Sequence, residues 1–313
     1  MKSEPYNKFG YGLFVLKSKN SLFNADFSHE PRQLPDANST FYATDKSLKY
    51  CIRRYVHDII DKKDKMVFFW RRNTKGGNAM NIAENYEHLF GKKPEKRDTK
   101  KEDDDANLKA QTNLLTCWDV RVFGATFAEE GCNVSITGPI QITYGVNKIS
   151  DNPKYSSQIL SPFKPEKEAE QRTIGSESKA LEAHLVFDFI INPHTLPSDI
   201  SKLTEEDVAL FKEALCKGVS YVNSAAKIGS ESEFALYFES PNQSTLPLLK
   251  DLLTLEVFEG KTKIDLKRMT DALSEYNVEN VEIYYEPSFV EVKNAPKSAK
   301  SFNIHTLKKL KAE

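Results

Sequence analysis

Residues 183–191 read A-H-L-V-F-D-F-I-I, a run of aromatic and β-branched side chains that predicts a buried core strand. The clearest helix follows at residues 203–218, where Thr204 can cap the start, acidic side chains fill the first turn and Gly218 marks the end. A first strand is predicted far upstream, at residues 10–17 (G-Y-G-L-F-V-L-K). Strands and helices in this spaced order do not make a regular parallel βαβ series, so we expect an α+β fold.

Two long polar stretches interrupt the predicted core. Residues 71–113 are polar and include alternating blocks of basic and acidic side chains, which predicts an inserted, mobile lobe with little core of its own. Residues 148–180 lie between predicted strands and lack a strong hydrophobic period, which suggests a projecting hairpin. The basic tail, residues 293–313, is expected to be disordered or a short surface helix. The remaining ranges are expected to form an RRM-like (ferredoxin-like) sheet: residues 1–70, 114–147 and 181–292.

Further segments complete the outline. A T-D pair can cap a helix over residues 45–62, which carry an apolar stripe. K-M-V-F-F-W at residues 65–70 predicts a buried strand. D-V-R-V-F-G-A-T-F at residues 119–127 predicts another strand, followed by a turn and a strand at residues 135–144. Later strands are expected at residues 234–238 and 281–285, and later helices at residues 246–253 and 265–276.

The composition limits the possible functions. A net charge of −1 removes the simplest argument for nucleic-acid binding, a strongly basic domain, so such a role must rest on local clusters of Lys and Arg. With 39% hydrophobic and 28% charged residues, the composition is that of an ordinary globular protein. No apolar run reaches the roughly 18–20 residues that a membrane helix needs, so we expect a cytoplasmic protein without a membrane partner. The cysteines are not spaced as a metal site or disulfide framework, and we expect no metal and no cofactor.

One basic cluster stands at the start of the first predicted helix. Lys46, Lys49 and Arg53 follow at spacing i, i+3, i+7, directly after the long polar loop of residues 18–44. Together with the helix N-terminus, they form a candidate phosphate site. An ordinary solvated surface explains the same pattern, and the spacing alone leaves both interpretations open.

Several short motifs occur in a fixed order between about residues 10 and 230. They are Asn24-Ala25-Asp26, Pro31-Arg32, Thr44-Asp45, Leu48-Lys49 with Ile52-Arg53, D-V-R-V-F-G-A-T-F at residues 119–127, T-G-P-I-Q at residues 137–141 and Ile190-Ile191-Asn192-Pro193. In this order they resemble the repeated backbone subunits of type I-B and I-C CRISPR–Cas surveillance complexes (Cascade), within the RAMP superfamily. The first loop departs from the family form N-P-N-G-D, since it reads L-F-N-A-D, and the C-terminal third matches weakly.

The resemblance implies a non-catalytic subunit that polymerises along a CRISPR RNA. Its partners would be the guide RNA, target DNA, copies of itself in a helical filament and other Cascade subunits. It also implies an RRM-like palm, with residues 71–113 as a finger and residues 148–180 as a thumb that displaces one guide base at regular intervals. Because binding must be indifferent to spacer sequence, phosphates and sugars are the expected contacts. The candidate RNA-binding residues are Arg32, Lys46, Lys49, Arg53, Gln141, Asn147 and Lys148.

Two alternatives stay open at this point. Type III relatives in the superfamily cut RNA with a loop aspartate, and Asp26 or Asp36 could take that role. The chain could also be a free-standing RNA-binding protein outside CRISPR defence. We assign no catalytic residue.

Overall fold

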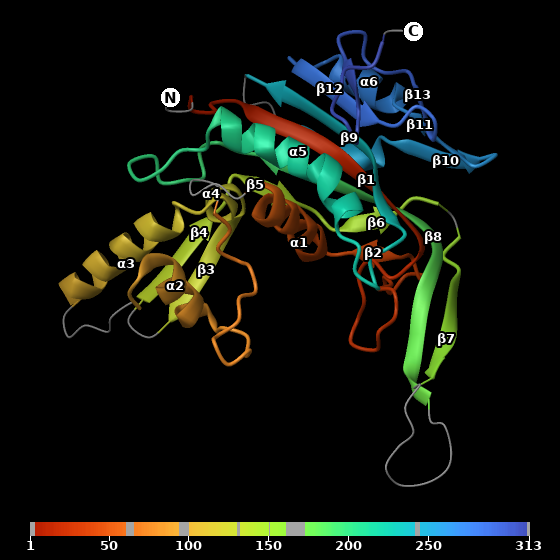
Figure 1. The fold of residues 1–313 in the computed structure, drawn as a ribbon. Coiled ribbons are helices and arrows are strands. Elements are labelled where there is room, and N and C mark those ends of the chain that lie inside the picture. The colour runs from red at the N-terminus through yellow and green to blue at the C-terminus, as the bar shows by residue number, and fades with distance from the viewer. Residues whose placement is uncertain are drawn as a thin grey trace, which may run out of the picture.

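The computed structural model describes residues 4–60, 66–93, 100–129, 132–149, 151–160, 173–241 and 245–311. Its helices and strands make a mixed α+β molecule, as expected (Figure 1). The helices are α1 (Asp45–Tyr55), α2 (Ile82–Phe90), α3 (Lys100–Leu114), α4 (Trp118–Phe123), α5 (Glu205–Tyr221) and α6 (Lys267–Leu273), with a π-helical turn at Val56–Ile60 and a 3-10 turn at Leu249–Asp251. The strands are β1 (Phe9–Ser21), β2 (Tyr42–Ala43), β3 (Gly124–Glu129), β4 (Cys132–Thr137), β5 (Ile140–Ile142), β6 (Gly145–Asn147), β7 (Lys154–Leu160), β8 (Thr173–Ile191), β9 (Ser230–Ser240), β10 (Thr254–Phe258), β11 (Lys261–Asp265), β12 (Glu279–Tyr285), β13 (Val290–Lys293) and β14 (Lys300–Asn303).

One large sheet organises the molecule. Its strands lie in the order β14-β12-β9-β1-β8-β6-β2, and β5 and β7 also pair with β8. β1 is central and antiparallel to both β8 and β9, which confirms the strands predicted at residues 10–17, 183–191 and 234–238. Gly12 permits this packing, because a Cβ there would lie 2.2 Å from both the Leu236 carbonyl oxygen and the Phe189 ring.

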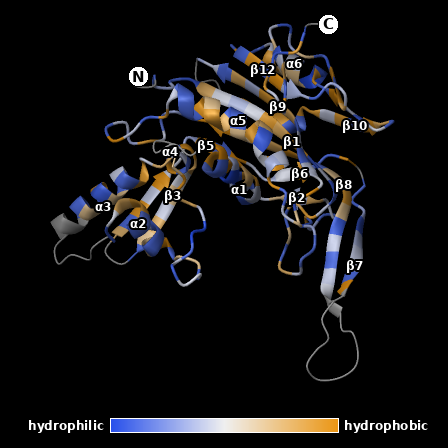
Figure 2. Ribbon diagram, in the orientation of Figure 1, coloured by the Kyte–Doolittle hydropathy of each residue, from blue (hydrophilic) through white to orange (hydrophobic). Residues whose placement is uncertain are grey.

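The two faces of this sheet bury different layers. Phe14 and Leu16 of β1 face the side where α1 and α5 pack, and Leu13 and Val15 face the C-terminal layer of β10, β11, β13 and α6. All four side chains are fully buried, and burial of each contributes about 1.5–3 kcal/mol. Figure 2 shows hydrophobic positions gathered where these layers meet and hydrophilic positions on the outward turns of α1 and α3.

α5 begins where predicted and runs one turn further than predicted. Thr204 caps it in a capping box with Asp207, in which each side chain accepts a hydrogen bond from the other residue's amide. Gly218 was expected to end the helix but lies inside it. A Cβ on Gly218 would stand 2.9 Å from the Cys51 carbonyl oxygen of α1, so the glycine serves the close crossing of two helices.

A lobe of α2, α3, β3 and β4 projects from one end of the sheet. β3 and β4 form a two-stranded sheet of their own, although the sequence suggested that they belong to the large sheet. Residues 71–113 were expected to have little core, but Tyr86 is buried and its ring lies 5.1 Å from that of the buried Phe127 of β3. Both side chains join the core that surrounds α1 and α5.

Two predicted strands are wrong, for a shared reason. Residues 119–127 were predicted as one strand, but the first half is helix α4 and only the part from Gly124 is strand. The described part of the strand predicted at residues 65–70 has no strand geometry. Its Phe68 and Phe69 amides donate instead to the buried Asp119 carboxylate, at 2.7 and 3.1 Å. One buried carboxylate thus satisfies the backbone donors that a neighbouring strand would otherwise take.

The C-terminal tail is also different from the prediction. Residues 293–313 were expected to be disordered or a surface helix, yet β14 adds a parallel edge strand to β12. Phe302 stacks on Tyr284 with ring centroids 5.2 Å apart, and Ile304 is fully buried.

The helix expected at residues 246–253 is a single 3-10 turn. No helix in the described ranges is long and apolar enough to cross a membrane.

A hairpin of β7 and β8 projects on the same side as the lobe, with α1 between them (Figure 1). β8 has 19 residues: its last part pairs with β1, and its first part pairs with β7 from Lys154↔Ala180 outward. The tip of the hairpin predicted at residues 148–180 lies outside the described residues.

Candidate nucleic-acid interface

The long loop before α1 is tied to the start of the helix. Asn24 Oδ1 accepts hydrogen bonds from the Thr44 amide and hydroxyl, at 2.9 and 3.1 Å. Thr44 in turn caps α1, because its Oγ1 accepts from the Ser47 amide at 3.4 Å. Asp45 adds a negative charge to the first turn, where the helix dipole favours it. The predicted cap is confirmed, and the N-A-D segment fixes where the helix begins.

Asp26 and Asp36, the candidates for RNA cleavage, both act as turn-forming carboxylates. Asp26 Oδ1 accepts from the Glu30 and Ser28 amides at 3.0 and 2.9 Å, and Asp36 Oδ1 accepts from the Thr40 amide at 2.9 Å. These backbone hydrogen bonds hold the pKa of each carboxyl below its ordinary value. A carboxylate of lowered pKa is a weak general base near neutral pH. The described residues include no group of three His, Cys, Asp or Glu side chains placed to share a metal ion.

The base of the β7–β8 hairpin contacts the same loop. Asn152 Oδ1 accepts from the Phe41 amide at 3.0 Å and from Asn147 Nδ2 at 2.9 Å. Lys154 of β7 forms an ion pair with Glu30 of the loop. Asn147, a predicted RNA contact, is buried, and its Oδ1 accepts a backbone amide of β8 at 2.7 Å. It therefore lies inside the joint between loop and hairpin.

The three basic side chains predicted to share one face of α1 have separate surroundings. Lys46 is 83% exposed. Lys49 is buried, its Nζ donates to Asp45 at 3.0 Å, and burial lowers its pKa. Arg53 Nε donates to the buried Asp119 carboxylate at 2.9 Å. Lys49 and Arg53 are therefore each paired with an acidic side chain of the protein itself.

A different stripe of α1 is open to solvent. It consists of Lys46, Tyr50 and Arg54, and His57 of the following π-helical turn continues it. Lys46 and Tyr50 are exposed, and Arg54 and His57 are partly exposed. Trp70 lies beside it, and its ring centroid is 6.0 Å from that of Tyr50 and 4.6 Å from that of His57. The Arg54 guanidinium lies 5.1 Å from the Trp70 ring centroid. Arg54 is not among the contacts predicted from sequence, although its i+4 spacing from Tyr50 and i+8 spacing from Lys46 place it on the same stripe.

Asp58 holds the far end of this stripe. Its carboxylate accepts hydrogen bonds from Arg54 Nε, from His57 Nδ1 at 2.9 Å and from the Tyr221 hydroxyl at 3.1 Å. Burial raises the pKa of Asp58, but these three hydrogen bonds outweigh it and keep the pKa below the ordinary value. Asp58 is therefore ionised near neutral pH and fixes the Arg54 guanidinium.

The other predicted contacts are not gathered at one place. Arg32 lies in the loop beside α1, and its Nε is buried with no hydrogen-bond partner among the described residues. Gln141 points to the opposite face of the sheet, and its Nε2 donates to the Gly138 carbonyl at 2.8 Å. Lys148 Nζ lies 3.8 Å from the Asp251 carboxylate. Gln141 thus lies on the sheet face opposite α1, away from Lys46.

Comparison with known proteins gives the family. The chain matches the family described as CRISPR-associated protein Cas7 over residues 8–280. The chain belongs to the Cas7 family. The backbone-subunit family predicted from the ordered motifs is thereby confirmed, whereas the type I-B or I-C affiliation stays a prediction.

Two of the solved structures that match are similar in fold to this chain. A chain of a "CRISPR RNA-guided surveillance complex, pre-nicking" superposes with a TM-score of 0.54 at 13% identity, covering 92% of this chain and 96% of that chain. A chain of a "CRISPR RNA-guided surveillance complex" superposes with a TM-score of 0.51 at 11% identity, covering 92% and 95%. No curated protein sequence matches this chain. At such low identity these likenesses concern the fold alone.

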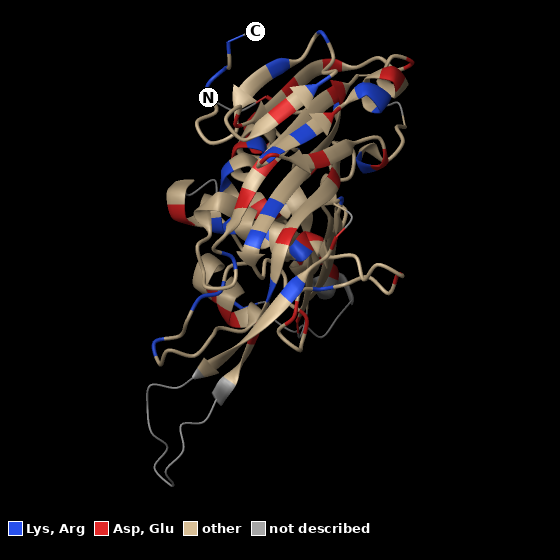
Figure 3. Ribbon diagram, turned by 90° about the vertical axis from the view of Figure 1, so that its right-hand side faces the viewer, with Lys and Arg blue, Asp and Glu red and all other residues tan. Residues whose placement is uncertain are grey.

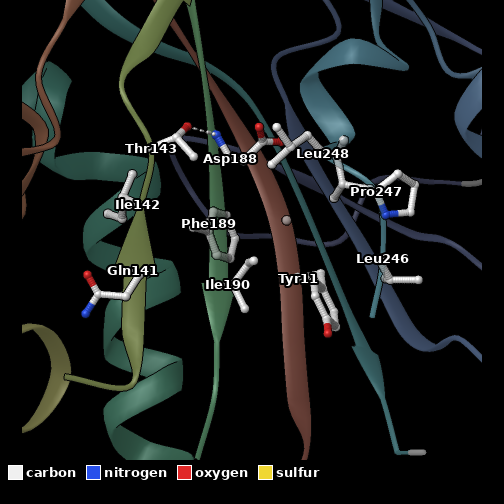
Figure 4. A pocket seen from close by; sticks show the side chains of 12 residues that line it. Tyr11, Gln141, Ile142, Thr143, Asp188, Phe189, Ile190, Leu246, Pro247 and Leu248 are labelled. Atoms are coloured by element: carbon white, nitrogen blue, oxygen red, sulfur yellow. Dashed lines mark hydrogen bonds between the residues drawn. The ribbon is translucent and has the colours of Figure 1, made fainter. Parts of the chain in front are cut away.

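A small apolar pocket opens in this Cas7 chain on the sheet face opposite α1 (Figure 4). It measures about 140 Å³, and the side chains of Tyr11, Ile190 and Leu248 line it. Asp188 lies at its edge and is buried, which raises the pKa of its carboxyl. Its Oδ1 accepts from the Lys250 amide at 2.8 Å, so the carboxylate holds in place the segment that forms one wall.

Charge in this Cas7 chain is mixed. Figure 3 shows basic and acidic positions interspersed along the sheet and its C-terminal strands. Many of them are paired, as Lys8 is with Glu239 at 2.7 Å and Lys212 with Glu282 at 2.6 Å. The exposed stripe of α1 is therefore a local feature on a molecule without one dominant sign.

Proposed function

We propose that this Cas7 chain is a non-catalytic subunit that binds CRISPR RNA by its sugar–phosphate backbone. Copies of the chain would align along the guide, with other Cascade subunits, and present its bases to target DNA in antiviral defence. The observation that carries the proposal is the exposed Lys46–Arg54 stripe of α1 in a member of the Cas7 family. Cations that contact phosphates hold any spacer equally well, because phosphates carry no base identity. We place this assembly in the cytoplasm.

The strand order supports an RRM-like palm. β1, α1, β6, β8, α5 and β9 follow one another as βαββαβ, and their strands lie side by side as β9-β1-β8-β6. This is the ferredoxin-like arrangement. We assign residues 71–113 together with β3 and β4 to the finger, and residues 148–180 to the thumb.

We revise the roles of the predicted RNA contacts. Lys46 and Arg32 stay as phosphate contacts, and Arg54 joins them. Lys49 and Arg53 would act indirectly. Arg53 joins α1 to the buried Asp119 of α4, and Lys49 pairs with Asp45 within α1 itself. Two predicted contacts at the hairpin base, Asn147 and Lys148, would shape the joint between palm and thumb, and Gln141 would contact RNA only if the guide also passes over the opposite sheet face.

Lys46→Ala and Arg54→Ala should each weaken binding of single-stranded RNA by a similar factor for every spacer sequence. Each loss of a phosphate contact should also lower the slope of log affinity against log salt by about 0.7. Fluorescence anisotropy over a salt series measures both quantities. Lys267→Ala is the matched control, since Lys267 is exposed on α6 in the other layer. An effect that varies strongly with spacer sequence would contradict phosphate contact.

The cleavage alternative is tested by RNA hydrolysis. Incubating the assembled complex with guide-matched RNA and magnesium should leave the RNA intact, and Asp26→Asn and Asp36→Asn should change nothing. The physical reason is that both carboxylates are weak bases already committed to turns. Periodic cuts that disappear in either variant would replace the scaffold proposal with a nuclease. Recovery of the chain as a monomer free of small RNA would favour a protein outside CRISPR defence.

A further inference from the structure

A polar pocket of about 330 Å³ lies at the far end of the exposed stripe of α1. Its volume is at the lower end of the roughly 300–1,000 Å³ typical of small-molecule sites, which suits a single ring system. α1 and the segment that leaves α5 form it together. The lining residues are Tyr50, Arg54, Tyr221, Val222, Asn223 and Ser224.

Of the three stacked rings of Tyr50, Trp70 and His57, Tyr50 is the one that lines this pocket, and the Lys227 ammonium lies 6.0 Å from the Tyr50 ring centroid. Tyr50 is 43% exposed, and its ring lies at 22° to that of Trp70, with centroids 6.0 Å apart. Trp70 continues the stack to His57, at 26° and 4.6 Å. A ring held by such a stack is ordered before any ligand arrives, which lowers the entropic cost of binding.

Hydrogen-bonding groups make the rest of the wall. The Arg54 guanidinium is fixed by Asp58 and is 41% exposed, so part of it faces solvent. Asn223 and Ser224 are exposed at the rim and offer both donors and acceptors. An aromatic surface framed by a guanidinium, an amide and a hydroxyl matches the stacking face and polar edge of a nucleobase.

We propose that this aromatic pocket receives an unpaired base of the single-stranded RNA that the protein holds. The base stacks on Tyr50, and Asn223 and Ser224 meet its polar edge. Arg54 contributes a cation beside the stack and reaches the adjoining phosphate. The proposal rests on the proposed function, since Lys46 and Arg54 lead the RNA backbone along α1 to the pocket. It adds a base-contacting site to a surface otherwise expected to read only the backbone.

Photocrosslinking of the full-length protein tests this directly. A single-stranded RNA oligonucleotide that carries 5-iodouridine is irradiated with the protein, and the adduct is mapped by mass spectrometry. The expected adduct lies on Tyr50 or on its neighbours Trp70 and Tyr221. Tyr50→Ala should remove it and weaken RNA binding about tenfold, because a base stacked on an aromatic ring is lost. Tyr50→Phe keeps the ring and should retain both adduct and affinity.

The controls separate this inference from the proposed function. Phe289→Ala removes an aromatic ring that is 57% exposed in the C-terminal layer and should change neither adduct nor affinity. RNA binding with adducts only elsewhere, or with undiminished affinity in Tyr50→Ala, overturns the pocket while the scaffold proposal stands. Absence of RNA binding in the parent protein overturns both. An adduct formed only with the corresponding 5-iododeoxyuridine DNA overturns the proposal that a guide base enters the pocket. The target DNA strand would then supply the base.

Discussion

Replacing Asp119 with alanine should lower the free energy of unfolding by about 3–5 kcal/mol, the cost of breaking a buried ion pair from one side. The Asp119 carboxylate is fully buried and binds three donors: Arg53 Nε at 2.9 Å, the Phe68 amide at 2.7 Å and the Phe69 amide at 3.1 Å. Alanine would leave a guanidinium and two backbone amides without their acceptor. Urea denaturation followed by circular dichroism measures the loss.

A double-mutant cycle with Arg53→Ala decides what Arg53 does. If Arg53 serves the fold, the double variant should lose less stability than the sum of the two single losses, by about 0.5–3 kcal/mol. Asp271→Ala is the matched control, because that carboxylate is exposed in an i,i+4 pair with Lys267, which is worth at most about 0.5 kcal/mol. If Arg53→Ala leaves the stability unchanged but weakens RNA binding, Arg53 contacts RNA directly, as predicted from sequence.

Gly124→Ala is the second substitution expected to have a large effect, with a loss of about 2–6 kcal/mol from strain and overlap together. Gly124 has φ 81° and ψ 179°, a conformation that essentially only glycine adopts. A Cβ there would also lie 2.2 Å from the Ile136 carbonyl oxygen and 2.5 Å from the Gly138 amide nitrogen. The backbone where α4 meets β3 would have to move away from the end of β4.

Gly77→Ala is the control for a glycine of positive φ without steric overlap. Gly77 has a nearly identical φ of 82°, but a Cβ there meets no atom within 4 Å. Its replacement should therefore cost only about 1 kcal/mol, the backbone penalty without the overlap. Equal losses for the two variants in urea denaturation would contradict the larger loss expected at Gly124.

The central strands were predictable from sequence because they are buried on both faces. Residues 10–17 and 183–191 are almost continuously apolar, and their enrichment in aromatic and β-branched side chains favours strands over helices. The D-V-R-V-F segment alternates like a strand but folds as helix α4. The Asp119 side chain of this segment binds two amides about 50 residues away in the chain, and local periodicity contains no information about that contact.

The candidate interface stays a prediction, and the structure bears only on the elements and side chains that would form it. The loop, the cap and the basic first helix were all found from sequence. Lys49 pairs with Asp45 four residues earlier in the same helix, a contact that spacing alone allows. Spacing could not show the partner of Arg53, because Asp119 lies 66 residues further along the chain. Arg54 was overlooked since its neighbours at helical spacing are aromatic, and their role becomes visible only when Trp70 packs beside them.

The uninterrupted course of β8 has a mechanical consequence. β8 has 19 residues: it begins in the projecting hairpin and ends beside β1. The hairpin is therefore joined to the centre of the sheet by one continuous strand. No loop separates the two parts of β8, so a force on the hairpin passes to the hydrogen bonds between β8 and β1. If copies of the chain align as proposed and touch through this hairpin, the distance between neighbouring copies would depend on the length and pairing of β8.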